Sequence, residues 1–323
     1  MKILITGGSG FIGTHLIKSL FSLKGEISIL NVDLNNSPIL HPHLKTVITD
    51  IRSNNLHNIL AESSDFDQCI HLAAICKEPG YEWKEYFETN HVGTKNIISL
   101  CDKLNIPKII FTSTMMVYKA GEEQKTELSQ TDPDTAYGIS KLLAEKELEK
   151  WKYRGTDREL KIIRPAVVFG ENENANFTRL YKSLKKGFFP YVGKKTTIKS
   201  NIYVHELNSF IIFLMTKPTK SNIYNFGFPE LSSINHITST FNEVFGIKAF
   251  RPTIPLRIMI LLAHFFQLLN RFGFKNSIHP RRIEKLYYST DIYPKAALDE
   301  GYQFKFNLSS ALEDWKKSDD INM

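Results

Sequence analysis

A tyrosine and a lysine, Tyr137 and Lys141, stand four residues apart in a stretch rich in alanine, leucine, glutamate and lysine. That composition predicts a helix over residues 137–151, and the spacing places both side chains on one face of it. A phenol with a pKa of about 10 is a poor base at neutral pH, but a neighbouring ammonium group favours its ionised form. Tyr137 could then remove a proton from a substrate hydroxyl while a hydride leaves the carbon beneath it.

The hydroxyl residue Thr114 ends an apolar run over residues 108–114 that is typical of a buried strand. In that place its hydroxyl would hydrogen-bond the substrate oxygen as this oxygen becomes a carbonyl. A tyrosine and a lysine at this spacing occur often by chance, so the pair alone is a weak sign of catalysis. Its position after a strand ending in Ser113 and Thr114, downstream of a glycine-rich loop, favours the catalytic interpretation.

That glycine-rich loop lies within residues 2–13, where an apolar run breaks into glycines and resumes with helical spacing. The pattern predicts a strand, a tight phosphate-binding turn and a helix whose N-terminus would hold a dinucleotide pyrophosphate. A second strand over residues 27–32 ends at Asp33, about 20 residues after the glycines, where a carboxylate would hold ribose hydroxyls. No lysine or arginine follows within residues 33–37 to meet a 2′-phosphate, so the sequence favours NAD over NADP as the cofactor.

Further strand-like runs alternate with helical segments through the first half of the chain, which indicates βαβ units. We therefore expect an α/β fold, a Rossmann-like doubly wound parallel sheet with a smaller C-terminal substrate-binding lobe. Residues 1–170 would form the NAD-binding part, to which residues 200–228 return, and residues 171–323 would form the lobe. The additional strands are expected at residues 45–49, 68–74, 160–165 and 223–227, with a long helix over residues 85–104.

The formal net charge is +7, but the basic residues are spread along the chain and no nucleic-acid motif is visible. An anionic small substrate is therefore expected instead of nucleic acid. Three scattered cysteines, Cys69, Cys76 and Cys101, suit neither a zinc site nor a disulfide framework, so we expect no metal and a reducing compartment. The first strand leaves no room for a signal peptide, and a cytoplasmic location is expected.

Residues 254–272 form the most apolar segment, but Arg257, His264 and Arg271 interrupt it at intervals of seven. These interruptions argue against a membrane span, which needs about 20 mostly apolar residues. We expect a largely buried amphipathic helix. A helix at the membrane surface, and with it peripheral association, is the alternative.

Four motifs carry a family resemblance: GGSGFIG at residues 7–13, HLAA at residues 71–74, Asn90 with Gly93-Thr94, and YGISK at residues 137–141. They resemble motifs of the extended short-chain dehydrogenase/reductases, specifically the NAD-dependent epimerase/dehydratase family that acts on nucleotide sugars. The resemblance implies that Thr114, Tyr137 and Lys141 are catalytic and that Lys141 also holds the nicotinamide ribose. The cofactor-binding residues that it implies are Gly7, Gly10, Phe11, Ile12, Gly13, Asp33, Asp50, Ile51, Leu72, Ala73, Ala74, Asn90, Tyr137 and Lys141.

The second half of the chain resembles the family more loosely. Asn176 resembles the start of the helix that contacts the nucleotide diphosphate, and Arg281 or Arg282 resembles the arginine that pairs with it. With Thr114, these are the substrate-binding residues that the resemblance implies. Sugar dehydratases of the family place an Asp-Glu pair directly after the strand-end threonine. Here Met115-Met116 follow instead, and because thioethers cannot relay protons, dehydration is not expected.

The leading hypothesis is an NAD-dependent nucleotide-sugar 4-epimerase that transiently oxidises C4 of a UDP-sugar. An NAD(P)H-dependent 4-keto nucleotide-sugar reductase of surface-polysaccharide biosynthesis is the first alternative, because the same residues would serve a single reduction. A non-catalytic cofactor-binding regulatory protein of the same fold is the second. The resemblance also implies a homodimer formed through the helices near residues 90–104 and 137–151.

Overall fold

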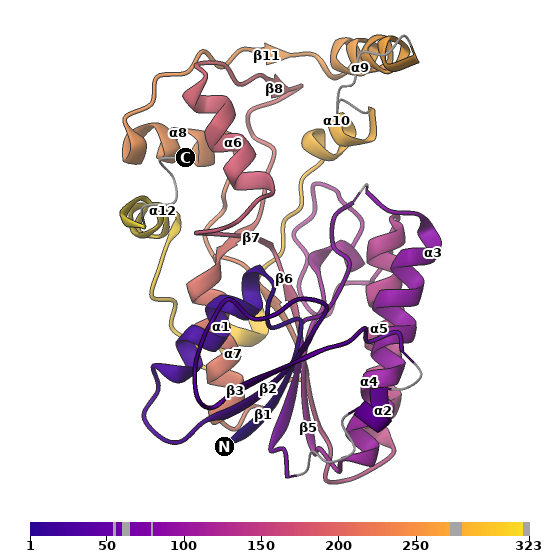
Figure 1. Cartoon of the computed structure of the whole chain (residues 1–323). Coiled ribbons are helices and arrows are strands. Elements are labelled where there is room, and N and C mark those ends of the chain that lie inside the picture. Colours follow the sequence, from indigo (N-terminus) through magenta and orange to yellow (C-terminus); the bar gives the residue numbers. More distant parts are fainter. Residues whose placement is uncertain (54–55, 60–64, 79, 272–279, 319–323) are drawn as a thin grey trace.

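A parallel sheet of seven strands in the order β10-β6-β5-β4-β1-β2-β3 forms the centre of this computed structural model (Figure 1). The structure describes residues 1–53, 56–59, 65–78, 80–271 and 280–318. Within these residues the predicted doubly wound α/β fold is confirmed. The strands of the sheet are β1 (Lys2–Thr6), β2 (Ser28–Asp33), β3 (Leu44–Ile48), β4 (Gln68–His71), β5 (Lys108–Thr112), β6 (Glu159–Pro165) and β10 (Ile223–Phe226).

Both faces of the sheet are buried, because side chains alternate between them along each strand. In β1, Ile3 and Ile5 enter the core that includes α1 (Phe11–Phe21) and α7 (Val204–Thr216). Leu4 enters the opposite core, with α4 (Gly93–Lys103) and α5 (Ala136–Tyr153). Figure 1 shows α1 and α7 on one side of the sheet and α4 and α5 on the other.

The strand order reverses next to β1, which pairs with β2 on one side and with β4 on the other. In open α/β sheets, ligands bind beyond the carboxyl ends of the strands at this reversal. The loop that follows β1 and the segment that follows β4 therefore face the expected binding crevice.

The long helix expected over residues 85–104 is present, but its middle is not α-helical. It consists of α3 (Trp83–Tyr86), a π-helical segment η1 (Phe87–Val92) and α4. A π-helical turn accommodates one extra residue, and such turns are frequent at functional sites. Here the turn directs Asn90 into the protein, where it is 1% exposed.

The C-terminal lobe lies above the carboxyl ends of the sheet strands in Figure 1. The lobe is not one continuous stretch of sequence. After its first elements the chain returns to the main sheet, where β10 pairs with β6 at the edge. Phe226 of β10 stacks on Phe210 of α7 with ring centroids 4.1 Å apart, so this returning strand shares the core. The remaining elements are α2 (Leu56–Ile59), η2 (Met115–Val117), β7 (Val167–Phe169), α6 (Asn176–Lys185), β8 (Tyr191–Val192), β9 (Asn201–Tyr203), α8 (Ile234–Phe245), β11 (Thr253–Ile254), α9 (Leu256–Arg271), α10 (Pro280–Tyr287), α11 (Lys295–Asp299) and α12 (Leu308–Lys317).

The apolar segment at residues 254–272 forms the helix α9, as predicted, but its expected burial is wrong for one face. Ala263 is fully buried, whereas Leu261 is 70% exposed. The reason is that α9 lies at the margin of the lobe, where one face packs inward and nothing in the described chain covers the other. None of the helices in the described ranges combines the length and hydropathy that a bilayer crossing requires.

Candidate active site

Thr114 and Tyr137 meet where the carboxyl end of β5 faces the first turn of α5. The Thr114 side chain caps the short 3₁₀ helix η2, since its Oγ1 accepts the N–H of Met116 at 3.1 Å. The Tyr137 phenol lies beside the Thr114 hydroxyl, near enough for this hydroxyl to act on the pKa of the phenol. Thr135 caps α5 by accepting the N–H of Gly138 at 3.1 Å. Two helix caps therefore fix the two hydroxyl groups relative to one another.

Gly138 permits this close approach, and the sequence reasoning did not single it out. A Cβ at this position would lie 3.0 Å from the carbonyl carbon of Met116 and nearer still to its oxygen. Backbone atoms cannot give way as a flexible side chain can, so any larger residue would push α5 away from η2. The available signal was the glycine directly after the tyrosine in the YGISK motif.

Lys141 lies one turn after Tyr137 on α5 and is 1% exposed. Its Nζ stands 4.0 Å from the ring centroid of Phe111 on β5, a cation–π contact. Burial lowers the pKa of Lys141 to about 7, although the negative charge of Glu145 opposes the shift. Burial also raises the pKa of the Tyr137 phenol, and the neighbouring Thr114 hydroxyl opposes this shift. Without a cofactor, burial therefore outweighs the lowering of the Tyr137 pKa that is expected from a neighbouring ammonium group. A cationic oxidised nicotinamide would lower the pKa of this phenol.

The low pKa of Lys141 predicts a stability that depends on pH. In the unfolded chain the Lys141 ammonium keeps its proton up to about its ordinary pKa of 10.5, whereas in the folded chain it releases the proton near pH 7. The unfolded chain therefore binds this proton more tightly than the folded chain does. A charged Lys141 therefore destabilises the cofactor-free protein at and below pH 7, and the penalty disappears as the pH rises toward 10. We expect Lys141→Met to be more stable than the wild type at pH 7 and to lose this advantage near pH 10.

Urea unfolding of both proteins from pH 7 to 10 measures this difference. Comparing the two proteins removes the contribution of Lys199, whose pKa burial lowers to about 8 and which titrates in the same range. A stability difference that stays constant over this range would contradict the assignment.

A buried ion pair links the elements that carry Thr114, Tyr137 and Lys141. Arg164, at the end of β6, holds Glu145 of α5 with two hydrogen bonds, Nε to Oε1 at 3.0 Å and Nη2 to Oε2 at 2.6 Å. Ser113, the neighbour of Thr114, donates its hydroxyl to the same carboxylate. Glu145 was missed by the sequence reasoning, although it follows Lys141 by four residues and so shares its helix face. The pair connects the ends of β5 and β6 to α5.

The glycine-rich loop after β1 has the shape that a pyrophosphate site needs. Gly7 has φ +76°, a left-handed conformation, and a Cβ there would lie 2.6 Å from the backbone nitrogen of Ala73. A Cβ on Gly13 would lie 2.5 Å from the Cα of Gly8. Helix α1 begins at Phe11 after Gly10, without a side-chain cap and without an acidic residue in its first turn. This N-terminus therefore presents main-chain donors to an anion, which fits a dinucleotide.

We expect Gly13→Ala to weaken NAD binding by about tenfold or more, because the added methyl group displaces the loop that α1 packs against. Calorimetric titration of NAD into the purified protein measures the effect. Gly121→Ala is the matched control, since a Cβ there meets nothing within 4 Å. Equal NAD affinities for the two variants would show that the loop does not carry the pyrophosphate.

Asp33 stands beside this loop, as the sequence predicts. Its carboxylate accepts the N–H of Ser9 at 3.0 Å and that of Asn35 at 3.0 Å, which places it at the end of β2 next to the glycines. On the other side of the crevice, Leu72 donates its N–H to the carbonyl of Thr6. Ala73 and Ala74 continue from it along the edge of the loop.

Three other predicted cofactor residues have partners within the chain. Asp50 forms an ion pair with Arg52 at 2.6 Å, and this pair lowers the pKa of the carboxyl. Ile51 is 5% exposed and packs against Gly93 of α4, where a Cβ would lie 2.6 Å from its Cδ1. Asn90 bonds both backbone groups of Ile75 and the hydroxyl of Ser140. Their contacts with a cofactor remain predictions, and Asn90 connects the loop after β4 to α5.

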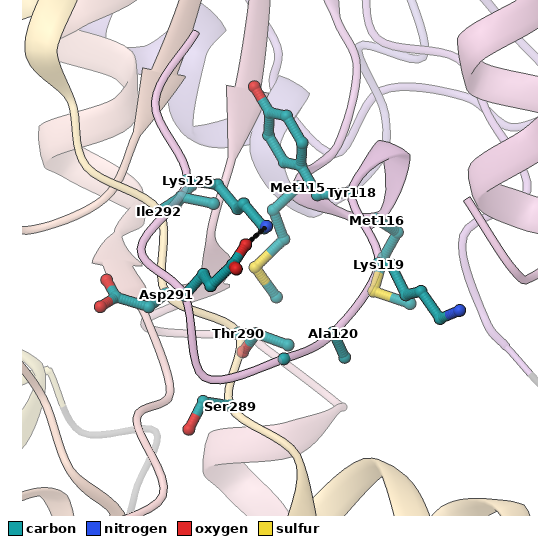
Figure 2. A pocket seen from close by; sticks show the side chains of 12 residues that line it. Met115, Met116, Tyr118, Lys119, Ala120, Lys125, Ser289, Thr290, Asp291 and Ile292 are labelled. Carbon is teal, nitrogen blue, oxygen red and sulfur yellow. Dashed lines mark hydrogen bonds and ion pairs between the residues drawn. The ribbon is translucent and has the colours of Figure 1, made fainter. Parts of the chain in front are cut away.

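A small hollow opens beside Thr114, between the loop at residues 119–125 and the segment at residues 289–292 (Figure 2). Met115 and Met116 line it with their thioethers, and Lys125 forms an ion pair with Glu123 at 2.7 Å on its wall. The methionines follow Thr114 directly, so the position where a dehydratase needs proton-transfer groups is apolar.

Residues 3–227 match the sequence model of the NAD dependent epimerase/dehydratase family. The chain belongs to this family. The matched residues include all four motifs, and the resemblance drawn from these motifs is confirmed. The family is NAD-dependent, in agreement with the predicted cofactor.

Several relatives of this epimerase/dehydratase family member carry 4-epimerase names, and one from Mycolicibacterium neoaurum, 26% identical over 96% of this chain and 89% of the relative, is named a 3-beta-hydroxysteroid dehydrogenase. One of the 4-epimerases is an N-acetyl-alpha-D-glucosaminyl-diphospho-ditrans,octacis-undecaprenol 4-epimerase from Escherichia coli O157:H7, 29% identical over 97% of this chain and 93% of the relative. Another is a UDP-glucose 4-epimerase from Neisseria meningitidis serogroup C, 24% identical over 98% of this chain and 96% of the relative. The solved structure of a Bacillus cereus UDP-glucuronic acid 4-epimerase with UDP-glucuronic acid and NAD shares the fold, with a TM-score of 0.77, 22% identity and coverage of 100% and 99%.

The predicted substrate residues of this family member are only partly described. Asn176 is exposed at the start of α6, where the resemblance places it. Arg281 and Arg282 lie in the first turn of α10, but their side chains fall outside the described part of the structure. Their proposed contact with a diphosphate therefore remains a prediction. Among the described residues, no cluster of side chains suits a metal ion.

Proposed function

We propose that this chain is an NAD-dependent 4-epimerase acting on a sugar that is joined to UDP. The observation that carries the proposal is the placement of the Tyr137 phenol beside the Thr114 hydroxyl, with Lys141 one turn away, at the carboxyl end of β5. The glycine loop opens onto the same edge of the sheet, beside β1. The 4-epimerase names of several relatives support the choice of reaction.

Tyr137 would accept the proton of the C4 hydroxyl, and Thr114 would donate a hydrogen bond to the oxygen as it becomes a carbonyl. NAD supplies the redox chemistry, because it takes up a hydride and later returns one. When the hydride returns to the other face of C4, Tyr137 gives the proton back to the oxygen. The sugar thus gains and loses the same atoms, and its configuration at C4 is inverted without net oxidation.

A second candidate substrate has its own supporting observation. The Escherichia coli relative, aligned over nearly the whole chain, is named for a sugar whose diphosphate is joined to undecaprenol instead of to a nucleoside. Catalysis at C4 would use the same three residues, since the sugar and its diphosphate are common to both substrate classes. The two classes differ only beyond the diphosphate.

NMR of the purified protein with NAD tests the proposal directly. One arm supplies UDP-glucose, UDP-N-acetylglucosamine and their C4 epimers, and the other supplies N-acetylglucosaminyl diphosphoundecaprenol in detergent micelles. Inversion at C4 without net change in NADH absorbance supports the epimerase. Stoichiometric NADH consumption with a 4-keto nucleotide sugar, in the absence of inversion, would identify the reductase instead. Inversion of the lipid-linked sugar alone would select the second substrate class.

We also propose a homodimer through α4 and α5, which the family resemblance implies, and light scattering of the purified protein measures it. A cytoplasmic location is proposed from the cysteines. All three thiols are free, and Cys69 and Cys101 are buried, as in proteins that remain in a reducing compartment.

A further inference from the structure

One face of α9 is apolar and exposed. Its members, Ile258, Leu261, Leu262 and Phe265, are 49%, 70%, 43% and 55% exposed, and we call them the α9 patch. Their spacing of three, four and seven residues places all four on one side of the helix. Scattered exposed apolar residues are common on proteins, but a continuous helical stripe of large ones marks an interaction surface.

The opposite face of α9 already has its partners. Ala263 is fully buried and lies in a small core with Val192 of β8 and Ile283 of α10. Leu256, Met259 and Ile260 pack against the same core. The helix is thus held in the lobe by one side, and the α9 patch is not needed to complete that core.

The sequence segment that contains α9 is basic, and acidic residues occur only at its flanks, at Glu243 and Glu284. Residues 244–283 contain no aspartate or glutamate, whereas they contain seven lysines and arginines. The formal net charge of the whole chain is also +7, so the remaining residues balance to zero. Arg257 and His264 lie seven residues apart along one margin of the patch and are exposed. A basic helix with one large apolar face has the composition of helices that lie in the headgroup region of a membrane.

The dimensions of α9 suit a helix that lies flat. Its 16 residues span about 24 Å, and an apolar helix needs about 20 residues to cross the hydrocarbon core. In Figure 1, α9 lies at the outer margin of the C-terminal lobe, far from the sheet, with α10 beneath it. Leu286 and Tyr288, which follow in the α10 segment, are also 45% and 46% exposed.

We propose that the α9 patch docks onto an anionic lipid bilayer, with the helix lying in the plane of the membrane. The apolar side chains would enter the headgroup and acyl boundary, and the surrounding cations would meet lipid phosphates. A second copy of the chain fits less well, because it would place two predominantly basic segments against one another. The inference goes beyond the proposed catalytic function and does not depend on it.

Sedimentation of the full-length protein with vesicles tests the docking. We expect binding to vesicles that contain phosphatidylglycerol, weaker binding to phosphatidylcholine alone, and a decrease with added salt. The double variant Leu261→Glu, Phe265→Glu should lower the partition coefficient at least about tenfold, because two apolar anchors become anions. Both positions are exposed, so turnover of a soluble UDP-sugar should not change.

The matched control is the double variant Leu40→Glu, Leu128→Glu, which changes two leucines that are 97% and 92% exposed outside the lobe. It adds the same charge and should bind vesicles much as the wild type does. Three results would overturn the proposal: no binding by the wild type, equal losses in both variants, or equal binding to neutral and anionic vesicles. Dissociation of a dimer by the α9 variant, without vesicle binding by the wild type, would identify a second copy as the partner. Because vesicle binding is measured without substrate, an absence of epimerase activity would not affect this test.

Discussion

Replacing Tyr137 with phenylalanine is expected to lower kcat by about 10²- to 10⁴-fold, the range that positioned general acid–base groups contribute. Tyr137 is partly buried, and its phenol lies beside the Thr114 hydroxyl. Phenylalanine keeps the ring and its packing but removes the hydroxyl that, in the proposed mechanism, takes and returns the C4 proton. Substrate binding rests on other contacts, so KM should change much less than kcat.

The same helix provides the control, since Tyr153 is 82% exposed near the end of α5. Tyr153→Phe removes a hydroxyl from the same type of residue and should leave kcat unchanged. Steady-state C4 inversion and thermal unfolding of both variants separate a chemical defect from a folding defect. Undiminished turnover in folded Tyr137→Phe would refute the catalytic role. If the wild type and the Tyr137→Phe variant both bind NAD but neither inverts C4 of any substrate, the result would agree with the non-catalytic alternative.

Glu145→Ala is expected to lower the free energy of unfolding by about 3–5 kcal/mol, the cost of leaving one partner of a buried ion pair unpaired. Arg164 is 4% exposed, and the two carboxylate oxygens of Glu145 accept bonds from its Nε and Nη2. Without Glu145 the guanidinium retains its bond to the Tyr118 hydroxyl at 2.7 Å but loses its only counter-charge in the described ion pairs. Denaturant unfolding measures the loss.

An exposed ion pair gives the comparison. Lys295 and Asp299 lie four residues apart on α11 at 2.7 Å, and their side chains are 52% and 60% exposed. Asp299→Ala should cost at most about 1 kcal/mol, as exposed pairs generally do. If Glu145→Ala costs no more than Asp299→Ala, the buried pair does not hold α5 to the sheet, and the position of Lys141 must have another origin.

Local sequence patterns were sufficient to predict much of this molecule. Glycines followed by a helical period locate the nucleotide loop, because the turn and the helix are formed by consecutive residues. The strand that ends at Thr114 and the helix that carries Tyr137 and Lys141 follow from composition and spacing in the same way. Parallel order then brings both to one edge of the sheet, so the motifs that carry the family resemblance are all formed by local stretches of sequence.

Contacts between distant residues were beyond such patterns. The bond of Glu145 to Arg164 joins residues 19 apart in the sequence. Sequence periodicity does not predict which arginine pairs with which carboxylate. The requirement for glycine at Gly138 depends on the backbone of Met116, on another element. The apolar period of α9 predicted a helix correctly but could not tell which of its two apolar faces would be covered, since that depends on where the lobe ends.

The return of β10 to the sheet determines how the chain could be divided. A polypeptide ending at residue 170 would leave β6 as an edge strand, with its backbone groups unpaired where Ile223–Phe226 now bind. It would also uncover the apolar face that α7 and α12 now seal with Phe210, Leu214 and Trp315. Residues 1–170 are therefore not a transplantable module. An exchange of C-terminal lobes between relatives would have to keep residues 201–226 and α12 together with residues 1–170.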